Sequence, residues 1–159
     1  MNYRRLWIGL AVVIVASFLV LGYYGTQIYR VKPPIPDKVV TSNGNVLFSG
    51  QDIKDGQNVW QSMGGQEVGS IWGHGSYVAP DWTADWLHRE SMFMLNHWAE
   101  HDYDQTYEQL DSEKKALLQA RLQNEMRTNT YHEETNEVVI SPLRAQAIRH
   151  VSQHYTGLF

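Results

Sequence analysis

The longest apolar stretch lies near the amino terminus, where Leu6–Gly25 holds twenty residues without a charge. At ~1.5 Å per residue, a helix of this length crosses the ~30 Å hydrocarbon core of a bilayer. A cleaved signal peptide is the alternative, but its apolar region is shorter, about 7–15 residues, and ends at a small-residue cleavage site. Arg4 and Arg5 precede the stretch, and Trp7 and Tyr23 lie where interfacial aromatic residues belong. We therefore expect a cytoplasmic tail at residues 1–5, a single membrane anchor at 6–29, and export of the rest.

Polar and turn-forming residues follow the anchor. Lys32–Lys38 reads KPPIPDK and predicts a stiff spacer, so residues 30–45 are expected to be a proline-rich linker. Asn43 and Gly44 separate two short apolar runs within Val39–Phe48, which is a hairpin signal. The remaining residues, 46–159, are expected to form one domain outside the membrane. Because the chain stops at the apolar Phe159, we expect this domain to be truncated at its carboxyl end.

The domain has the hydrophobic pattern of a mainly α fold with short hairpins. The predicted helices cover Gln51–Met63, Trp82 to about His101, Asp111 to about Asn129, and the segment that begins at Ser141-Pro142. Each is preceded by an N-cap residue: Ser49, Asp81, Asp111 and Ser141. The second helix carries a broad apolar stripe, which predicts burial on more than one side, whereas the third has a single apolar face. A polar turn and a short strand are expected within Thr130–Ile140.

An unusual segment, Gly64–Glu90, follows the first predicted helix and extends into the second. It contains five glycines and three tryptophans. Its centre, Gly73–Tyr77, reads GHGSY and predicts a tight loop that exposes carbonyl groups beside one phenol. Ordering such a loop is costly, so we expect it to meet a partner or a ligand.

Composition narrows the chemistry. The chain has no cysteine, which excludes disulfides, thiolate metal sites and C-x-x-C-H attachment of haem. Acidic residues outnumber basic ones, 17 to 13, and the formal net charge is −4. Such a surface is a poor partner for nucleic acid.

Three histidine patterns suggest metal or proton chemistry. His97, Glu100 and His101 match H-x-x-E-H, in which two histidines one helical turn apart share a zinc and the glutamate activates water. That motif also needs a third ligand, and the alternative is a solvated helix end. His150 and His154 have the same spacing, with a polar helix face as the alternative. His74, inside the glycine loop, is a proton carrier, a haem neighbour or a structural imidazole that satisfies loop carbonyls.

The glycine loop itself offers oxygen ligands. Hard cations such as calcium accept carbonyl and phenol oxygens. The loop contains too few charged ligands to hold calcium alone, so carboxylates from elsewhere would be required.

The residues also carry a family resemblance. The run Gly56–Trp60 (GQNVW), the loop and tryptophan segment GHGSYVAPDWTADWLHRE, Lys114–Tyr131 and Ser141–Ala147 together resemble the amino-terminal region of bacterial quinol-dependent nitric oxide reductase. The resemblance covers nearly the whole chain. It implies a haemless cytochrome c-like periplasmic domain behind one transmembrane helix in the bacterial inner membrane.

What the resemblance implies for haem can be stated position by position. In the related cytochrome subunits, C-x-x-C-H attaches haem c just before a G-x-G-x-Y-x-x-P loop. Those three positions fall on Gly65, Val68 and Gly69 here. Electrons would then come from a membrane quinol and pass to haem b and to a haem b3/non-haem iron pair, where two nitric oxide molecules become nitrous oxide and water. Those cofactors belong to a multi-helix catalytic domain that these residues do not contain, so this segment alone is not catalytic.

The resemblance also implies a metal site. In the family, the backbone carbonyl of the second loop glycine and the tyrosine hydroxyl coordinate a structural calcium, and these are Gly75 and Tyr77 here. A glutamate and haem propionates of the catalytic part complete that shared site. The expected partners are therefore this catalytic domain, in the same chain or a separate subunit, together with membrane lipid and quinol.

Two other functions remain open. One is a non-catalytic accessory subunit of a membrane oxidase, and the other is a membrane-anchored zinc peptidase that uses His97, Glu100 and His101.

Overall fold

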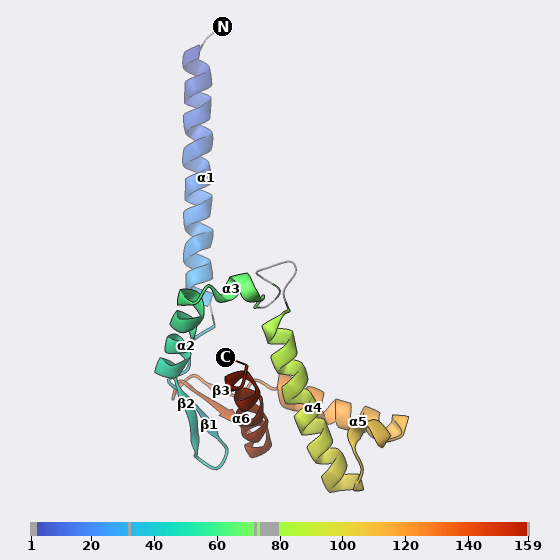
Figure 1. The fold of residues 1–159 in the computed structure, drawn as a ribbon. Coiled ribbons are helices and arrows are strands. Elements are labelled where there is room, and N and C mark those ends of the chain that lie inside the picture. Colours follow the sequence, from blue (N-terminus) through green and yellow to red (C-terminus); the bar gives the residue numbers. More distant parts are fainter. Residues whose placement is uncertain (1–2, 32, 72, 74–79, 159) are drawn as a thin grey trace. The chain divides into compact units, whose positions relative to one another are not determined.

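The computed structural model describes residues 3–31, 33–71, 73 and 80–158, which divide into two compact units at residues 35 and 36. The first unit contains helix α1, Tyr3–Val31, of 29 residues. This helix is long and apolar enough to cross a membrane, with a mean hydropathy of 2.4 over its most apolar part. It includes the whole of the anchor expected at residues 6–29 (Figure 1).

The second unit begins at residue 36 and contains a small mixed sheet in the order β2-β1-β4-β3. Strands β1 (Lys38–Thr41) and β2 (Val46–Ser49) form the expected hairpin, and Gly44 has a φ of 81° in its turn. Strands β3 (Tyr131–His132) and β4 (Glu137–Ile140) form a second antiparallel pair. Strand β1 also pairs in parallel with β4. This parallel pairing was not predicted from the sequence, and it places residues 36–45 within the second unit.

The predicted helices all form. Their bounds are α2 Gly50–Ser62, α4 Trp82–Tyr103, α5 Ser112–Arg127 and α6 Pro142–Thr156, and two short helices, α3 (Gly65–Val68) and η1 (Tyr107–Gln109), were not predicted. Side chains of the four expected residues, Ser49, Asp81, Asp111 and Ser141, cap the longer helices. Ser49 and Asp52 form a reciprocal capping box at α2. The local polar pattern therefore sets where each of these helices begins.

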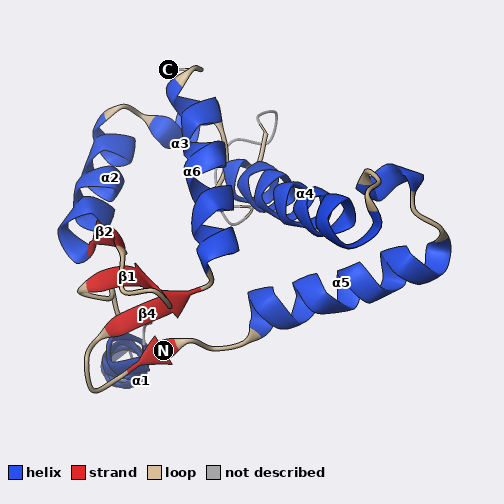
Figure 2. Ribbon diagram, turned by 90° about the horizontal axis from the view of Figure 1, so that it is seen from below, coloured by secondary structure: helices blue, strands red, loops and turns tan. Residues whose placement is uncertain are grey.

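Helix α4 is the centre of the second unit and packs against both α5 and α6 (Figure 2). The larger core cluster consists of Met94, Leu95, Trp98, Ala99, Leu110, Leu118 and Ala147. A smaller cluster, Val39, Ile140 and Ala145, joins the sheet to α6. Arg121 of α5 lies over the ring of Trp98, 4.4 Å from its centroid. The broad apolar stripe of α4 is thus buried on two sides, as its sequence predicted.

Candidate functional site

The two ends of the glycine loop are held together by backbone and side-chain hydrogen bonds. The N–H of Ser70 donates to the carbonyl of Pro80 (3.0 Å), and the N–H of Trp82 donates to the carbonyl of Ser70 (2.9 Å). The N–H of Gly73 donates to Asp81 Oδ2 at 2.7 Å, and Gly73 has a φ of 72°, where a side chain would be strained. These hydrogen bonds join the residues on either side of the loop, and we call them the base of the loop.

The residues expected to bind calcium, Gly75 and Tyr77, lie outside the described residues, and so does His74. The chemistry of the donor set can still be judged from its residue types. A backbone carbonyl and a neutral phenol are oxygen ligands suited to a hard cation such as calcium, although a complete site needs further oxygens. Gly73, two residues before Gly75, is among the described residues, and its N–H is held by Asp81.

Two of the positions that would carry a covalent haem are occupied by backbone packed against indole rings. A Cβ atom added to Gly65 would overlap the ring of Trp60, and one added to Gly69 would overlap the ring of Trp82. The third position, Val68, is 54% exposed. A cysteine or histidine at Gly65 or Gly69 would displace a tryptophan, so the residues present do not fit a covalently attached haem.

An apolar groove of about 870 Å³ separates α2 from α4 and α6. Its walls are mainly aromatic and aliphatic: Phe48, Ile53, Trp60, Ile71, Trp82, Trp86, Leu87, Ile148 and Tyr155. Helix α2 packs against β2 and α3. The two tryptophans that pack on Gly65 and Gly69 both line this groove.

An ion pair between a buried carboxylate and a half-buried guanidinium forms part of the groove wall and connects α4 to α6. Arg144 Nε donates to Glu90 Oε1 at 2.9 Å, and Trp86 Nε1 donates to Glu90 Oε2 at 3.1 Å. Glu90 is only 2% exposed. Glu90 was not expected from the sequence to be a site residue, although a charge inside the apolar stripe of a predicted helix indicates a buried partner.

A second polar link between the same helices involves Tyr155. Its hydroxyl donates to Asp85 Oδ2 at 2.6 Å, and its ring stacks on Trp86 with centroids 5.5 Å apart. Burial, followed by the neighbouring Asp85 carboxylate, raises the pKa of Tyr155 to about 12. Hydrogen bonds from Arg89 and then Tyr155 lower the pKa of Asp85. Tyr155 is therefore a neutral hydrogen-bond donor across the physiological range.

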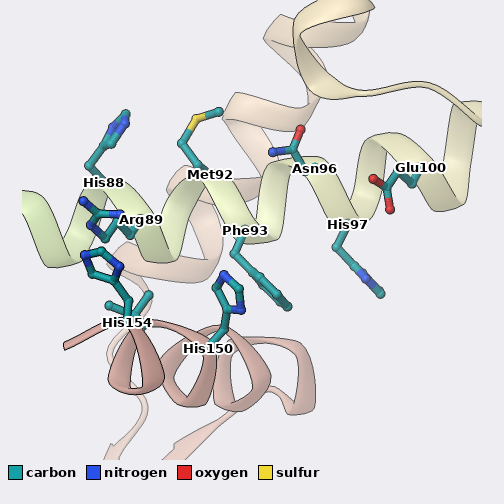
Figure 3. A pocket seen from close by; sticks show the side chains of 10 residues that line it. His88, Arg89, Met92, Phe93, Asn96, His97, Glu100, His150 and His154 are labelled. Carbon is teal, nitrogen blue, oxygen red and sulfur yellow. The ribbon is translucent and has the colours of Figure 1, made fainter. Parts of the chain in front are cut away.

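The histidines of the peptidase hypothesis lie at a different groove, of about 570 Å³, between α4 and α6 (Figure 3). His97 and Glu100 line this groove, but the side chain of His101 is 77% exposed and pairs with Asp102. His150 packs against Phe93, with ring centroids 4.9 Å apart, and His154 packs against Tyr155. Within the part of the chain that the structure describes, no three histidine or acidic side chains are grouped to hold a metal. These residues provide no third ligand for a zinc site.

Comparison with known families identifies the second unit. Residues 36–159 match the family model of the NorB cytochrome c-like domain of nitric oxide reductase. The chain belongs to this family. A comparison with curated proteins gave no match. The cytochrome c-like domain thus has the mainly helical fold expected from the sequence, and its residues at Gly65 and Gly69 favour indole packing over haem attachment.

Proposed function

We propose that this chain is the membrane anchor and periplasmic cap of a quinol-dependent nitric oxide reductase. In this proposal the complete enzyme converts two nitric oxide molecules to nitrous oxide with electrons from a membrane quinol. The catalytic cofactors, haem b, haem b3 and non-haem iron, belong to a multi-helix domain outside these residues. The segment described here anchors and covers that domain and carries out no redox step itself.

The packing of Gly65 and Gly69 against tryptophan is the observation that supports this proposal most strongly. A cytochrome c-like domain that accepts electrons from a soluble cytochrome needs an attached haem. This chain has no cysteine to attach one, and indole rings occupy the space beside the two glycines. Electrons must then reach the catalytic domain by another route, and a membrane quinol is the donor that a membrane-anchored reductase can use.

The choice of electron donor can be measured directly on the full-length enzyme in detergent. We expect nitric oxide consumption with a reduced quinol analogue and none above background with reduced cytochrome c. A haem stain of the denatured protein should show no covalently bound haem. Turnover with reduced cytochrome c at a rate similar to the quinol rate would overturn the proposal.

The second part of the proposal is a calcium shared between this domain and the catalytic domain. The carbonyl of Gly75 and the hydroxyl of Tyr77 would supply two oxygen ligands, and the catalytic domain would supply the charged ones. Such an ion would fix the cap to the catalytic domain, because neither side has a complete ligand set.

Tyr77→Phe in the full-length enzyme tests the calcium site. It removes one ligand oxygen and keeps the ring, so we expect calcium to be lost more readily during dialysis against a chelator, as measured by mass spectrometry of the metal. Tyr103→Phe is the matched control, because the Tyr103 ring lies under Lys114 near the other end of α4 and would keep that contact. Equal calcium retention in both variants and the wild type would exclude Tyr77 as a ligand.

A further inference from the structure

The apolar groove beside α2, of about 870 Å³, has the size and the lining of a small-molecule site. Ligand pockets are usually clefts of about 300–1,000 Å³ with mainly apolar and aromatic walls and a few polar groups. The stacked rings of Trp86 and Tyr155 form part of the wall, and Trp82 meets Tyr155 edge to face, with ring centroids 6.1 Å apart. Such aromatic walls suit a flat ring.

Hydrogen bonds already use the polar atoms of two of these rings. Trp86 Nε1 donates to Glu90, and the Tyr155 hydroxyl donates to Asp85. The planes of the two rings differ by only 11°. This part of the wall is therefore ordered before a ligand arrives, which lowers the entropy cost of binding. What it offers to a ligand is apolar ring surface.

The polar groups of the groove wall favour a neutral ligand that brings a hydrogen-bond acceptor. Both oxygens of Glu90 are used by Arg144 and Trp86, and the charges of Glu90 and Arg144 offset one another. Among the described residues, the Arg144 guanidinium donates only through Nε, so its terminal nitrogens remain available as donors. Asp52 and Ser152 also line the groove, but both are exposed. An anionic ligand would meet the Glu90 carboxylate, whereas a carbonyl oxygen can accept from Arg144 without adding a charge.

A second donor at the groove lacks an acceptor. Trp60 lines the groove, and its indole N–H is buried without a hydrogen-bond partner among the described residues. Buried donors are nearly always paired, because an unpaired one raises the free energy of the folded state. The wall of the groove is therefore richer in donors than in acceptors.

We propose that this groove binds the ring of a quinone, a flat and neutral molecule with two carbonyl oxygens. The inference rests on the proposed function, in which the enzyme uses a membrane quinol. The groove is then a second site, separate from the redox site of the catalytic domain, and no electron transfer takes place in it. The ring lies against Trp86 and Tyr155, and one carbonyl oxygen accepts a hydrogen bond from Arg144.

Photolabelling of the full-length enzyme in detergent tests the site. A short-chain azidoquinone should label the peptides of α4 and α6 that line the groove, as identified by mass spectrometry. Leu87→Trp should reduce this labelling about tenfold, because Leu87 lines the groove, is 38% exposed, and can be replaced by a larger ring that fills the space. Leu117→Trp is the matched control, because Leu117 is 59% exposed on α5 and does not line the groove. Labelling that is absent from these peptides in the wild type, or unchanged in Leu87→Trp, overturns the proposal.

Competition between two unlabelled probes tests the hydrogen bond from Arg144. One probe is the short-chain quinone, and the other is a benzene with the same alkyl chain and no oxygen. In the wild type the quinone should compete for groove labelling about tenfold more strongly, as expected for one hydrogen bond to a charged donor. Arg144→Met combined with Glu90→Leu removes the donor without leaving a buried unpaired charge, and it should abolish the preference. The same preference in the folded double variant would overturn the role of Arg144.

The outcomes distinguish this inference from the proposed function. If a reduced quinol supports nitric oxide consumption but the azidoquinone does not label the groove, the function stands and the inference is wrong. If the groove is labelled but no quinol supports turnover, the groove binds the ring and the proposed function is wrong. If organic extraction of the wild type, but not of Leu87→Trp, yields a bound lipid and no quinone, the groove holds an acyl chain and the inference is wrong.

Discussion

Arg144 on α6 donates a hydrogen bond to the buried carboxylate of Glu90 on α4, with 2.9 Å between Nε and Oε1. The two residues are 54 positions apart in the sequence. Their contact adds an ion pair between α4 and α6, the two helices that form one side of the apolar groove. The Glu90 carboxylate can be buried because Arg144 and Trp86 each donate a hydrogen bond to one of its oxygens.

Arg144→Met should destabilise the domain by about 3–5 kcal/mol, because it leaves the Glu90 carboxylate buried without its cation. The free energy of unfolding of the chain in detergent, from urea titration, measures this. Adding Glu90→Leu to Arg144→Met should recover most of the loss, since an apolar pair carries no desolvation cost. The Lys38–Glu137 pair, whose side chains are 45% and 22% exposed, is the less buried control, and Lys38→Ala should cost less than about 1 kcal/mol. If Arg144→Met also lowers the free energy of unfolding by less than about 1 kcal/mol, the ion pair contributes little to the stability of the domain.

Gly69→Ala should destabilise the domain by about 1–3 kcal/mol, because the added methyl group overlaps the Trp82 ring and forces it to move. Gly56→Ala is the matched control. Gly56 lies inside α2 with no atom near the position of an added Cβ, so alanine there should stabilise by about 0.5–1 kcal/mol through helix propensity. Thermal unfolding of both variants gives the comparison. If both substitutions stabilise, Trp82 does not occupy the space beside Gly69.

Tyr155 should remain protonated at pH values where an ordinary tyrosine ionises. Its folded-state pKa is raised from 10.0 to about 12, so the stabilisation from its neutral form is complete below pH 10 and is lost between pH 10 and 12. Ultraviolet titration at the phenolate band, compared with Tyr155→Phe, measures this while the protein stays folded. At pH 10 the wild type and Tyr155→Phe should show the same phenolate absorbance, because Tyr155 is still protonated. A half-completed transition there would show that Asp85 and burial do not hold the proton.

The capping aspartates should make the domain less stable in acid. Hydrogen bonds from the backbone of Ser49 and of Lys114 lower the pKa values of Asp52 and Asp111, respectively, below the usual 3.8. A depressed pKa contributes stability that is present above pH 3.8 and is lost as the pH falls through the folded-state value. The unfolding free energy should therefore decrease below about pH 4. Asp111→Asn keeps the cap and removes its titration, so its curve should be less steep than that of the wild type. An identical slope would exclude a contribution from Asp111.

Much of the fold was predictable because its signals are local. Each N-cap side chain reaches an N–H two or three residues ahead, so Ser49, Asp81, Asp111 and Ser141 marked the helix starts correctly. The hairpin turn was also readable, because Asn43-Gly44 is a local turn signal and Gly44 adopts the positive φ that glycine tolerates. The short helix α3 was missed because four residues carry too little periodicity to show a pattern.

The candidate site was only partly predictable. The glycine-rich loop and the helix-capping role of Asp81 were visible in the sequence, but the division of Asp81 between Gly73 and α4 was not. The link between Glu90 and Arg144 could not be read either, because nothing in the spacing of the residues says which helices face one another. The resemblance placed Gly65 and Gly69 at haem-attachment positions, and the structure supplied the reason that both are glycine.

The sequence by itself determined an apolar segment of membrane-spanning length, the starts of four helices and the lack of any thiol that could attach haem. These follow from composition and from hydrogen bonds between near neighbours, which need no knowledge of the fold. Only the tertiary structure decided that β1 pairs in parallel with β4, that Trp60 and Trp82 pack on two glycines, and that Glu90 meets Arg144. Apart from Trp60 and Gly65, which are five residues apart, those contacts join segments well separated in sequence, and they form because the burial of apolar faces brings particular elements together.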